Sequence, residues 1–144
     1  MYASPMAIEH AILWNNLISV VDSYNLPCII VGDFNEPLTT YDKLGGRNVS
    51  VNRSLLFKEC LDKCNMIDLG FTGPRFTWTN RRDIDDLIQE RIDRFFSNLG
   101  WYSLFPEAKV THLTQCHSDH CPVLMETQAN PAIFLKRLFK FQIF

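Results

Sequence analysis

A short apolar run, Cys28-Ile29-Ile30-Val31, limits the architectures open to this chain. Turn residues bound it, with Asn25-Leu26-Pro27 before it and Gly32 after it. A continuous β-branched run of this length predicts a short strand that is buried on both faces. Such a strand needs other elements packed over it, so the sequence predicts a layered fold.

Apolar spacing predicts one helix on each side of this strand. The first would have Ser4 as its N-cap and Pro5 in its first turn, and it would end near Tyr24. The second would begin at Asn52 and run to about Cys64. The apolar stripes would comprise Ile8, Ile12, Leu13, Leu17, Val20, Val21 and Tyr24 in the first helix, and Leu55, Leu56, Phe57, Cys60, Leu61 and Cys64 in the second.

Short strands dominate the rest of the chain. They are predicted at 66–69, 76–79, 90–96, 108–113 and 121–126, with a short helix at 99–105. In the strand at 90–96, Asp93 and Phe95 would share one face, because side chains alternate along a strand. Pro122 is typical of an edge or of a strand start. Helices and strands in this order predict the α/β (α+β) class, as a layered sandwich.

Composition excludes several classes of protein. Hydrophobic residues make up 47% of the 144 residues and charged residues 21%, so the chain has enough apolar material for a core and is not wholly disordered. The length fits one domain, or a fraction of a larger one. No apolar run approaches the ~20 residues of a membrane helix, and the first residues lack the basic region of a signal peptide. We therefore expect an intracellular protein, nuclear or cytoplasmic, with no membrane partner.

The charge balance bears on nucleic-acid binding. Fourteen Lys and Arg against sixteen Asp and Glu give a formal charge of −2, so a grip on nucleic acid would need a local basic patch. Arg75, Arg81 and Arg82 could form such a patch and contact phosphates. Acidic residues follow it directly at 83, 85 and 86, and their presence is also typical of a solvated loop.

Two polar clusters lie at the ends of predicted strands. In Gly32-Asp33-Phe34-Asn35, a carboxylate could bind a metal or polarise a water, and the Asn35 amide could hold a phosphoryl oxygen. The alternative is an Asx-type turn in which both side chains only satisfy backbone N–H groups. In Ser118-Asp119-His120, the histidine could exchange protons at neutral pH and Asp119 could bind a hard cation. The alternative is a loop histidine beside an exposed acid.

Asp93 is a third candidate, because a carboxylate inside an apolar strand is costly to bury unless it is paired. One interpretation pairs it with a neighbouring arginine, Arg91 or Arg94. The other pairs it with His120, so that it fixes the ring tautomer as in a His–Asp dyad.

Zinc and serine chemistry are less favoured. The five cysteines are an odd number without a CxxC pair, which favours a reducing compartment and no disulfide framework. The Cys and His spacings fit no standard zinc motif, and Cys60 and Cys64 fall on an apolar helix stripe. A nucleophile elbow and a phosphate-binding glycine loop are both absent.

Three motifs follow one another along the chain: Gly32-Asp33-Phe34-Asn35, Arg91-Ile92-Asp93-Arg94 and Ser118-Asp119-His120-Cys121-Pro122. Their order and approximate spacing resemble the endonuclease/exonuclease/phosphatase family, and most closely the endonuclease domain of plant non-LTR (LINE-type) retrotransposons. Further likeness lies in Tyr2-Ala3-Ser4-Pro5, in Phe76-Thr77-Trp78-Thr79-Asn80 and in Val110-Thr111-His112-Leu113. The resemblance covers nearly the whole chain, and the combination of motifs is specific although no single motif is.

The resemblance implies a sandwich of two β-sheets flanked by helices, and a metal-dependent phosphodiesterase that hydrolyses nucleic acid with an activated water. In the family, the match to Asp33 orients or activates the water, the match to Asn35 holds the phosphate, and the match to Asp93 orients the histidine that matches His120. Asp119 matches an acid close to the metal. The region near the substrate strand is matched by Thr77, Trp78 and Asn80, and Arg81 would join them in binding substrate.

The chain departs from the family pattern at its start. The family's main metal-binding glutamate lies upstream of the motif that Tyr2-Ala3-Ser4-Pro5 resembles, and this sequence begins at that motif. We therefore expect residues 1–128 to be the C-terminal portion of the domain, truncated on its N-terminal side. Glu9 and Glu36 are the nearest substitutes, and neither has the right context. Mg²⁺ (or Mn²⁺) would be bound weakly, since Mg²⁺ needs fixed oxygen ligands.

Residues 129–144 are predicted to be a connector or tail. Large apolar residues there mix with three bases, Lys136, Arg137 and Lys140. The alternative is a basic amphipathic segment on a membrane surface.

Three functions stay open. The first is a Mg²⁺-dependent nuclease that acts on DNA, weak or inactive alone. The second is a non-catalytic remnant of a retroelement, at most a binding module, and the third is a phosphatase on small phosphorylated substrates. A truncated sandwich would also expose an apolar sheet face, so we expect self-association through that face.

Overall fold

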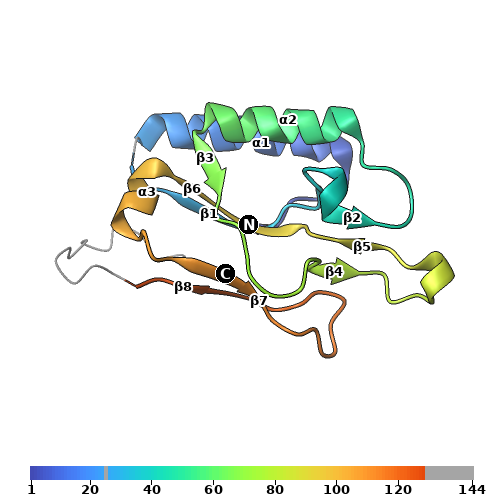
Figure 1. Ribbon diagram of the computed structural model, residues 1–144. Coiled ribbons are helices and arrows are strands. Elements are labelled where there is room, and N and C mark those ends of the chain that lie inside the picture. The colour runs from blue at the N-terminus through green and yellow to red at the C-terminus, as the bar shows by residue number, and fades with distance from the viewer. Residues whose placement is uncertain (25, 129–144) are drawn as a thin grey trace, which may run out of the picture.

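Two long helices lie side by side and cover one face of a three-stranded antiparallel sheet (Figure 1). They are α1 (Ala7–Tyr24) and α2 (Val51–Lys63). The computed structural model describes residues 1–24 and 26–128, so the predictions for 129–144 lie outside the described residues. Within them the fold is mixed α+β, with helices layered on antiparallel sheets, which confirms the predicted fold class.

The strands form three small sheets, all antiparallel. The central sheet has the order β1 (Ile29–Asp33), β6 (Asp93–Asn98), β3 (Met66–Asp68). A second sheet has the order β2 (Lys43–Leu44), β5 (Gln89–Glu90), β4 (Trp78–Thr79), and β7 (Lys109–His112) pairs with β8 (Val123–Glu126). The short helical elements are η1 (Thr40–Asp42), η2 (Ile84–Asp86) and α3 (Leu99–Leu104).

Aromatic side chains build the core between the helices and the central sheet. Trp14 of α1 stacks on Phe57 of α2, with ring centroids 4.4 Å apart. Phe34 lies edge-on to Phe96 of β6 at 5.1 Å, and it is fully buried. Each such pair adds about 0.5–1.5 kcal/mol beyond area burial. The core therefore anchors Phe34, the residue between Asp33 and Asn35, beneath both helices.

The predicted helices form, but their buried stripes differ from the prediction. In α1, Ile8 is 74% exposed and Ile12 is 61% exposed, while Trp14 is buried. In α2, Leu55 and Leu56 are more than half exposed. The physical reason is that each helix meets the sheet and its neighbour along one narrow stripe, so apolar residues outside that stripe stay in solvent. The helix starts also shift, since α1 begins at Ala7 and Ser50 caps α2 by accepting from Arg53 N at 3.5 Å.

The strand at 29–33 is present, but the prediction that it is buried on both faces is wrong. Only Ile30 is buried, and its four strand neighbours are half-buried. The strand also continues through Gly32 to Asp33, because both edges are paired. Asp33 N donates to the carbonyl oxygen of Met1 at 3.1 Å, and Ala3 N donates to that of Asp33 at 2.8 Å. Gly32 permits this approach, since a Cβ there would lie 1.8 Å from the Met1 carbonyl oxygen.

The strand predicted at 90–96 divides into β5 and β6. Arg91 N donates to the carbonyl oxygen of Asp42 at 2.8 Å, next to the Lys43–Glu90 pair of β2 and β5, whereas β6 pairs with β1 and β3 from Asp93 on. Downstream, β6 runs through the middle of the central sheet between β1 and β3. Asp93 is thus the first residue of the central strand. It lies at the end of that strand and not in its middle.

No helix among residues 1–24 and 26–128 is long and apolar enough to span a membrane. All five cysteines belong to these residues, and none forms a disulfide.

Candidate active site

The end of β1 and the start of β6 bring two carboxylates together. Asp33 is the last residue of β1 and Asp93 the first of β6, and the antiparallel register places them directly opposite each other. Opposed side chains in such a pair lie on the same face of the sheet. Like charges on directly opposed residues destabilise a sheet, so this pair of carboxylates needs a compensating group or a cation.

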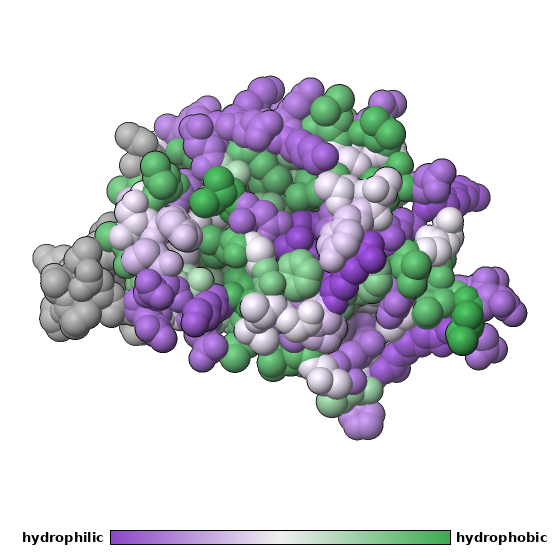
Figure 2. Space-filling view, in the orientation of Figure 1, coloured by the Kyte–Doolittle hydropathy of each residue, from purple (hydrophilic) through white to green (hydrophobic). Residues whose placement is uncertain are grey.

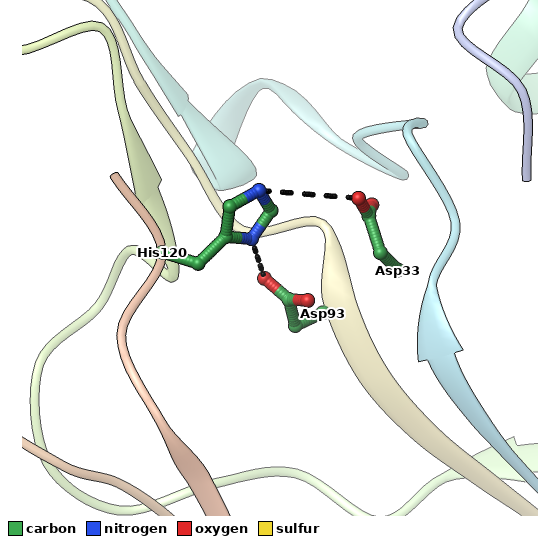
Figure 3. Close-up of side chains that lie close together, drawn as sticks. All are labelled: Asp33, Asp93 and His120. Atoms are coloured by element: carbon green, nitrogen blue, oxygen red, sulfur yellow. Dashed lines mark hydrogen bonds and ion pairs between the residues drawn. The ribbon is translucent and has the colours of Figure 1, made fainter. Parts of the chain in front are cut away.

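His120 supplies that group (Figure 3). Its Nδ1 lies 2.9 Å from Oδ2 of Asp93, and its Nε2 lies 4.0 Å from Oδ2 of Asp33. Because a carboxylate accepts, Nδ1 donates to Asp93 in this contact, and Nε2 faces Asp33. A backbone bridge between Trp78 and His120 joins the loop before β8 to β4 of the second sheet. This bridge holds the backbone that carries the His120 ring.

Asn35 orients the Asp33 carboxylate from the loop that leaves β1. Its backbone N–H donates to Oδ1 of Asp33 at 2.9 Å, and its Nδ2 donates to Oδ2 at 3.1 Å. The same Nδ2 donates to the carbonyl oxygen of Ala3 at 2.8 Å. The predicted Asx-type turn is therefore present, and it coexists with the cluster. Both amide hydrogens have protein acceptors, so a contact of Asn35 with a phosphoryl oxygen stays a prediction.

Thr77 holds the backbone that carries Asp93. Its hydroxyl oxygen accepts from the backbone N–H groups of Ile92 at 3.1 Å and of Asp93 at 3.0 Å. Thr77 is 1% exposed, so this hydroxyl faces the protein interior. The sequence interpretation placed Thr77 at the substrate, and this stays untested, whereas its support of Asp93 was not foreseen. Its position between a turn and Trp78 gave no signal of that support.

Asp119 lies beside the cluster but not within it. Its Oδ2 accepts from the indole Nε1 of Trp78 at 3.1 Å, and its carbonyl oxygen accepts from Thr79 N at 2.9 Å. Asp119 is exposed, and the hydrogen bond from Trp78 lowers the pKa of its carboxyl. Asp119 does not belong to the group of possible metal ligands that the described residues form, so its role as a metal ligand stays a prediction.

The remaining predicted substrate residues, Asn80 and Arg81, lie in the connection between β4 and β5. Arg81 donates from Nη2 to the carbonyl oxygen of Ser118 at 2.9 Å, which ties the β4–β5 connection to the loop that bears His120. Asn80 accepts at Oδ1 from Ile88 N at 2.9 Å and donates from Nδ2 to the carbonyl oxygen of Asp86 at 2.8 Å. The Asn80 side chain therefore closes the β4–β5 connection. Contact of either residue with a substrate stays a prediction.

Electrostatics distinguish Asp33 within the cluster. Burial raises the pKa of its carboxyl above the ordinary aspartate value, and the neighbouring Asp93 raises it further. The hydrogen bonds from Asn35 and the imidazole of His120 oppose that rise. Asp33 is thus a carboxyl with a raised pKa that faces an imidazole nitrogen, an arrangement suited to proton transfer.

The arginines in the third motif do not hold Asp93. Arg94 forms ion pairs at 2.6 Å with both Asp42 and Asp68, and Arg91 binds Asp68 at 2.8 Å. Asp93 instead pairs with His120, as the His–Asp interpretation predicted. These arginines satisfy a separate pair of acids, so they leave the Asp93 carboxylate to the imidazole.

The donor set suits a divalent cation. Asp33, Asp93 and His120 each offer one ligand atom, and these atoms lie within 4.8 Å of one another; they form the one such group among the described residues. Two carboxylates match the ligands of Mg²⁺, which usually keeps several waters. Asp33 and Asp93 would therefore hold the cation.

Scans of known protein-family models and of curated proteins both find no match to this chain.

Proposed function

We propose that this chain is a metal-dependent phosphodiesterase domain that hydrolyses nucleic acid, of the type found in retrotransposon endonucleases of the endonuclease/exonuclease/phosphatase family. One observation carries the proposal: His120 lies between the carboxylates of Asp33 and Asp93, bonded through Nδ1 and open at Nε2. Asp33, Asp93 and His120 each belong to a different motif of the chain. The resemblance assigns these three motifs to one site.

Hydrolysis of a phosphodiester needs a positioned water, a path for its proton and neutralised charge on the phosphoryl oxygens. In the proposed reaction Asp33 orients the water, whose oxygen bonds to phosphorus while its proton passes to Nε2 of His120. The P–O ester bond breaks, and its electron pair goes to the leaving oxygen, which then takes up a proton. Asp93 keeps the ring oriented through Nδ1. A bound divalent cation would neutralise the phosphoryl oxygens.

DNA is the proposed substrate because an aromatic ring and a guanidinium group, those of Trp78 and Arg81, lie near His120. Trp78 is half-buried beside Asp119, and Arg81 lies exposed next to Ser118. Aromatic rings stack on bases, and guanidinium groups bind phosphates. A small phosphorylated substrate without a base would give Trp78 nothing to stack on, so the ring favours a nucleic-acid strand.

The proposal is tested by nicking of supercoiled plasmid with added Mg²⁺. We expect the wild-type chain to nick weakly and His120→Ala to lose about 100- to 10,000-fold of that rate, the usual contribution of a general acid or base. His117→Ala is the matched control, because His117 is an exposed histidine three residues away in the same loop. Equal rates in all three proteins would contradict the proposal.

A second substrate separates the two hydrolase functions. Cleavage of p-nitrophenyl phosphate without nicking would favour a phosphatase over the nuclease. No turnover of either substrate, at any concentration of Mg²⁺ or Mn²⁺, would favour the non-catalytic alternative.

A further inference from the structure

A second group of titratable side chains lies on the helix side of the candidate site, around a buried carboxylate. Glu36, one residue after Asn35, is 2% exposed. Its Oε2 lies 2.6 Å from Nε of Arg53 and 3.4 Å from Nδ1 of His10, which is 4% exposed. The three side chains come from the loop after β1, from α2 and from α1, so this triad ties both helices to that loop.

Burying the Glu36 carboxylate is costly unless it is paired, and Arg53, whose side chain is 36% exposed, is its partner. Burial raises the pKa of the Glu36 carboxyl, and the positive charge of Arg53 opposes the rise. Neither Glu36 Oε2 nor Arg53 Nε has a directed hydrogen bond, so their contact is an ion pair. The pair thus joins a buried carboxylate to a guanidinium that reaches the surface of α2.

Arg53 connects the triad to the candidate site through Asn35. Its Nη2 donates to the carbonyl oxygen of Asn35 at 3.5 Å, while its Nε faces Glu36. Asn35 has a φ of +46°, a left-handed conformation that asparagine adopts more readily than most residues because its side chain can hydrogen-bond locally. In this conformation the N–H and side-chain amide of Asn35 both reach the Asp33 carboxylate. Asn35 thus has its carbonyl held by α2 and its donors directed at Asp33.

We propose that Arg53 and Glu36 are positioning residues: acting through Asn35, they hold the Asp33 carboxylate in the orientation that faces His120. Glu36 fixes the guanidinium, and the guanidinium fixes the Asn35 carbonyl. The catalytic consequence rests on the proposed function, whereas the structural coupling from Arg53 to Asn35 does not.

Arg53→Lys tests the coupling, because lysine keeps the charge for Glu36 but its single ammonium replaces a fork that reaches two partners. Arg47→Lys is the matched control, since Arg47 is exposed on the loop before α2. Hydrogen exchange measures the Asn35 N–H, which donates to Asp33. We expect its protection to fall about tenfold in Arg53→Lys, with no change at Ile30 in β1 and none anywhere in Arg47→Lys.

Kinetics then test the consequence. Arg53→Lys is expected to lower kcat for nicking about 10- to 100-fold and to leave KM unchanged, because misplacing an orienting group affects the transition state. Glu36→Gln keeps the side-chain shape and is expected to act in the same direction.

The outcomes separate the two proposals. A loss of protection confined to Asn35 supports the coupling even where the wild-type chain has no nuclease activity, which would overturn the proposed function alone. Unchanged protection of Asn35 in both Arg53→Lys and Glu36→Gln would overturn the coupling, and so would a loss spread evenly over β1.

Discussion

One buried hydroxyl supports the strand start on which Asp93 is placed. The Thr77 hydroxyl oxygen accepts from two backbone N–H groups, those of Ile92 and Asp93, where the chain passes from β5 to β6. Backbone donors there have left the β ladder, so they depend on a side chain. The geometry of a candidate catalytic acid thus depends on a residue that does no chemistry.

Thr77→Val should therefore destabilise the fold by about 2 kcal/mol, because valine has a similar shape but leaves both buried donors without an acceptor. Urea unfolding followed by circular dichroism measures the change. Thr111→Val is the control, since Thr111 on β7 is half-buried and its hydroxyl pairs only with that of Thr72, at 3.1 Å. Equal losses in the two variants would show that the Thr77 bonds do not carry this energy.

At the same scale, Asp93 illustrates how far sequence reasoning reaches. Local sequence offered Arg91 and Arg94 as partners as readily as a histidine 27 residues away. The two arginines form ion pairs with Asp42 and Asp68 instead, and these pairs are visible only in the tertiary fold. The motif as a whole predicted the His120 pairing, whereas Thr77 and Arg53 could not be predicted as supports because each acts through backbone geometry.

Among the elements, β7 is joined to the turn before β4 by a buried histidine. His112 is 2% exposed, stacks on Phe71 with ring centroids 4.3 Å apart, and donates from Nδ1 to the carbonyl oxygen of Pro74 at 2.7 Å. Burial lowers the pKa of its imidazole below the ordinary value. The folded state therefore binds this proton less readily than the unfolded state.

This difference gives a pH dependence with a definite sign. A histidine whose pKa is lowered by folding contributes stability that is present above its unfolded pKa, near 6.5, and is lost as pH falls below it. The free energy of unfolding should thus decrease from pH 7 to pH 5, by at most about 1.4 kcal/mol per pH unit for this one proton. In His112→Phe, which keeps the stacking on Phe71, the decrease should be smaller.

Urea unfolding at several pH values measures both slopes, with His117→Phe as the exposed control. The same slope in wild type and His112→Phe would contradict the argument. Buried His10 titrates in all three proteins, so its contribution cancels in the comparison.

Element types were more predictable than their surroundings. The run at 28–31 indicated a strand because β-branched residues and bounding turns are local signals. Its burial was wrongly predicted, since an antiparallel strand that pairs with β6 and with Met1–Ala3 is covered by helices on one face. Helix spacing likewise identified α1 and α2 but marked Ile8 and Ile12 as buried, because periodicity records apolar character and not which stripe meets a neighbour.

Across the whole molecule, exposed apolar side chains gather on the helix layer rather than on a sheet. Figure 2 shows hydrophobic groups between polar ones along this layer, at the top of the view. The exposed large apolar residues of the two helices are Ile8, Ile12, Val20, Tyr24, Val51, Leu55 and Leu56. The central sheet contributes only Ile67 among the described residues of its strands. The self-association predicted through a sheet face is therefore better placed on α1 and α2.

Exposed apolar groups on neighbouring helices favour association, because burying them removes apolar area from water at roughly 25 cal/mol per Å². We expect the purified chain to elute heavier than its 16.7 kDa and to bind ANS. Ile12→Lys should return it towards the monomer and reduce ANS fluorescence, since a charge among these apolar side chains resists desolvation. Ile84→Lys is the control, because Ile84 is 88% exposed in η2, on the β4–β5 connection rather than on a helix of this layer. A sharp monomeric peak with a cooperative melt in the wild-type chain would contradict self-association, and an equal effect of both lysines would contradict its place on the helices.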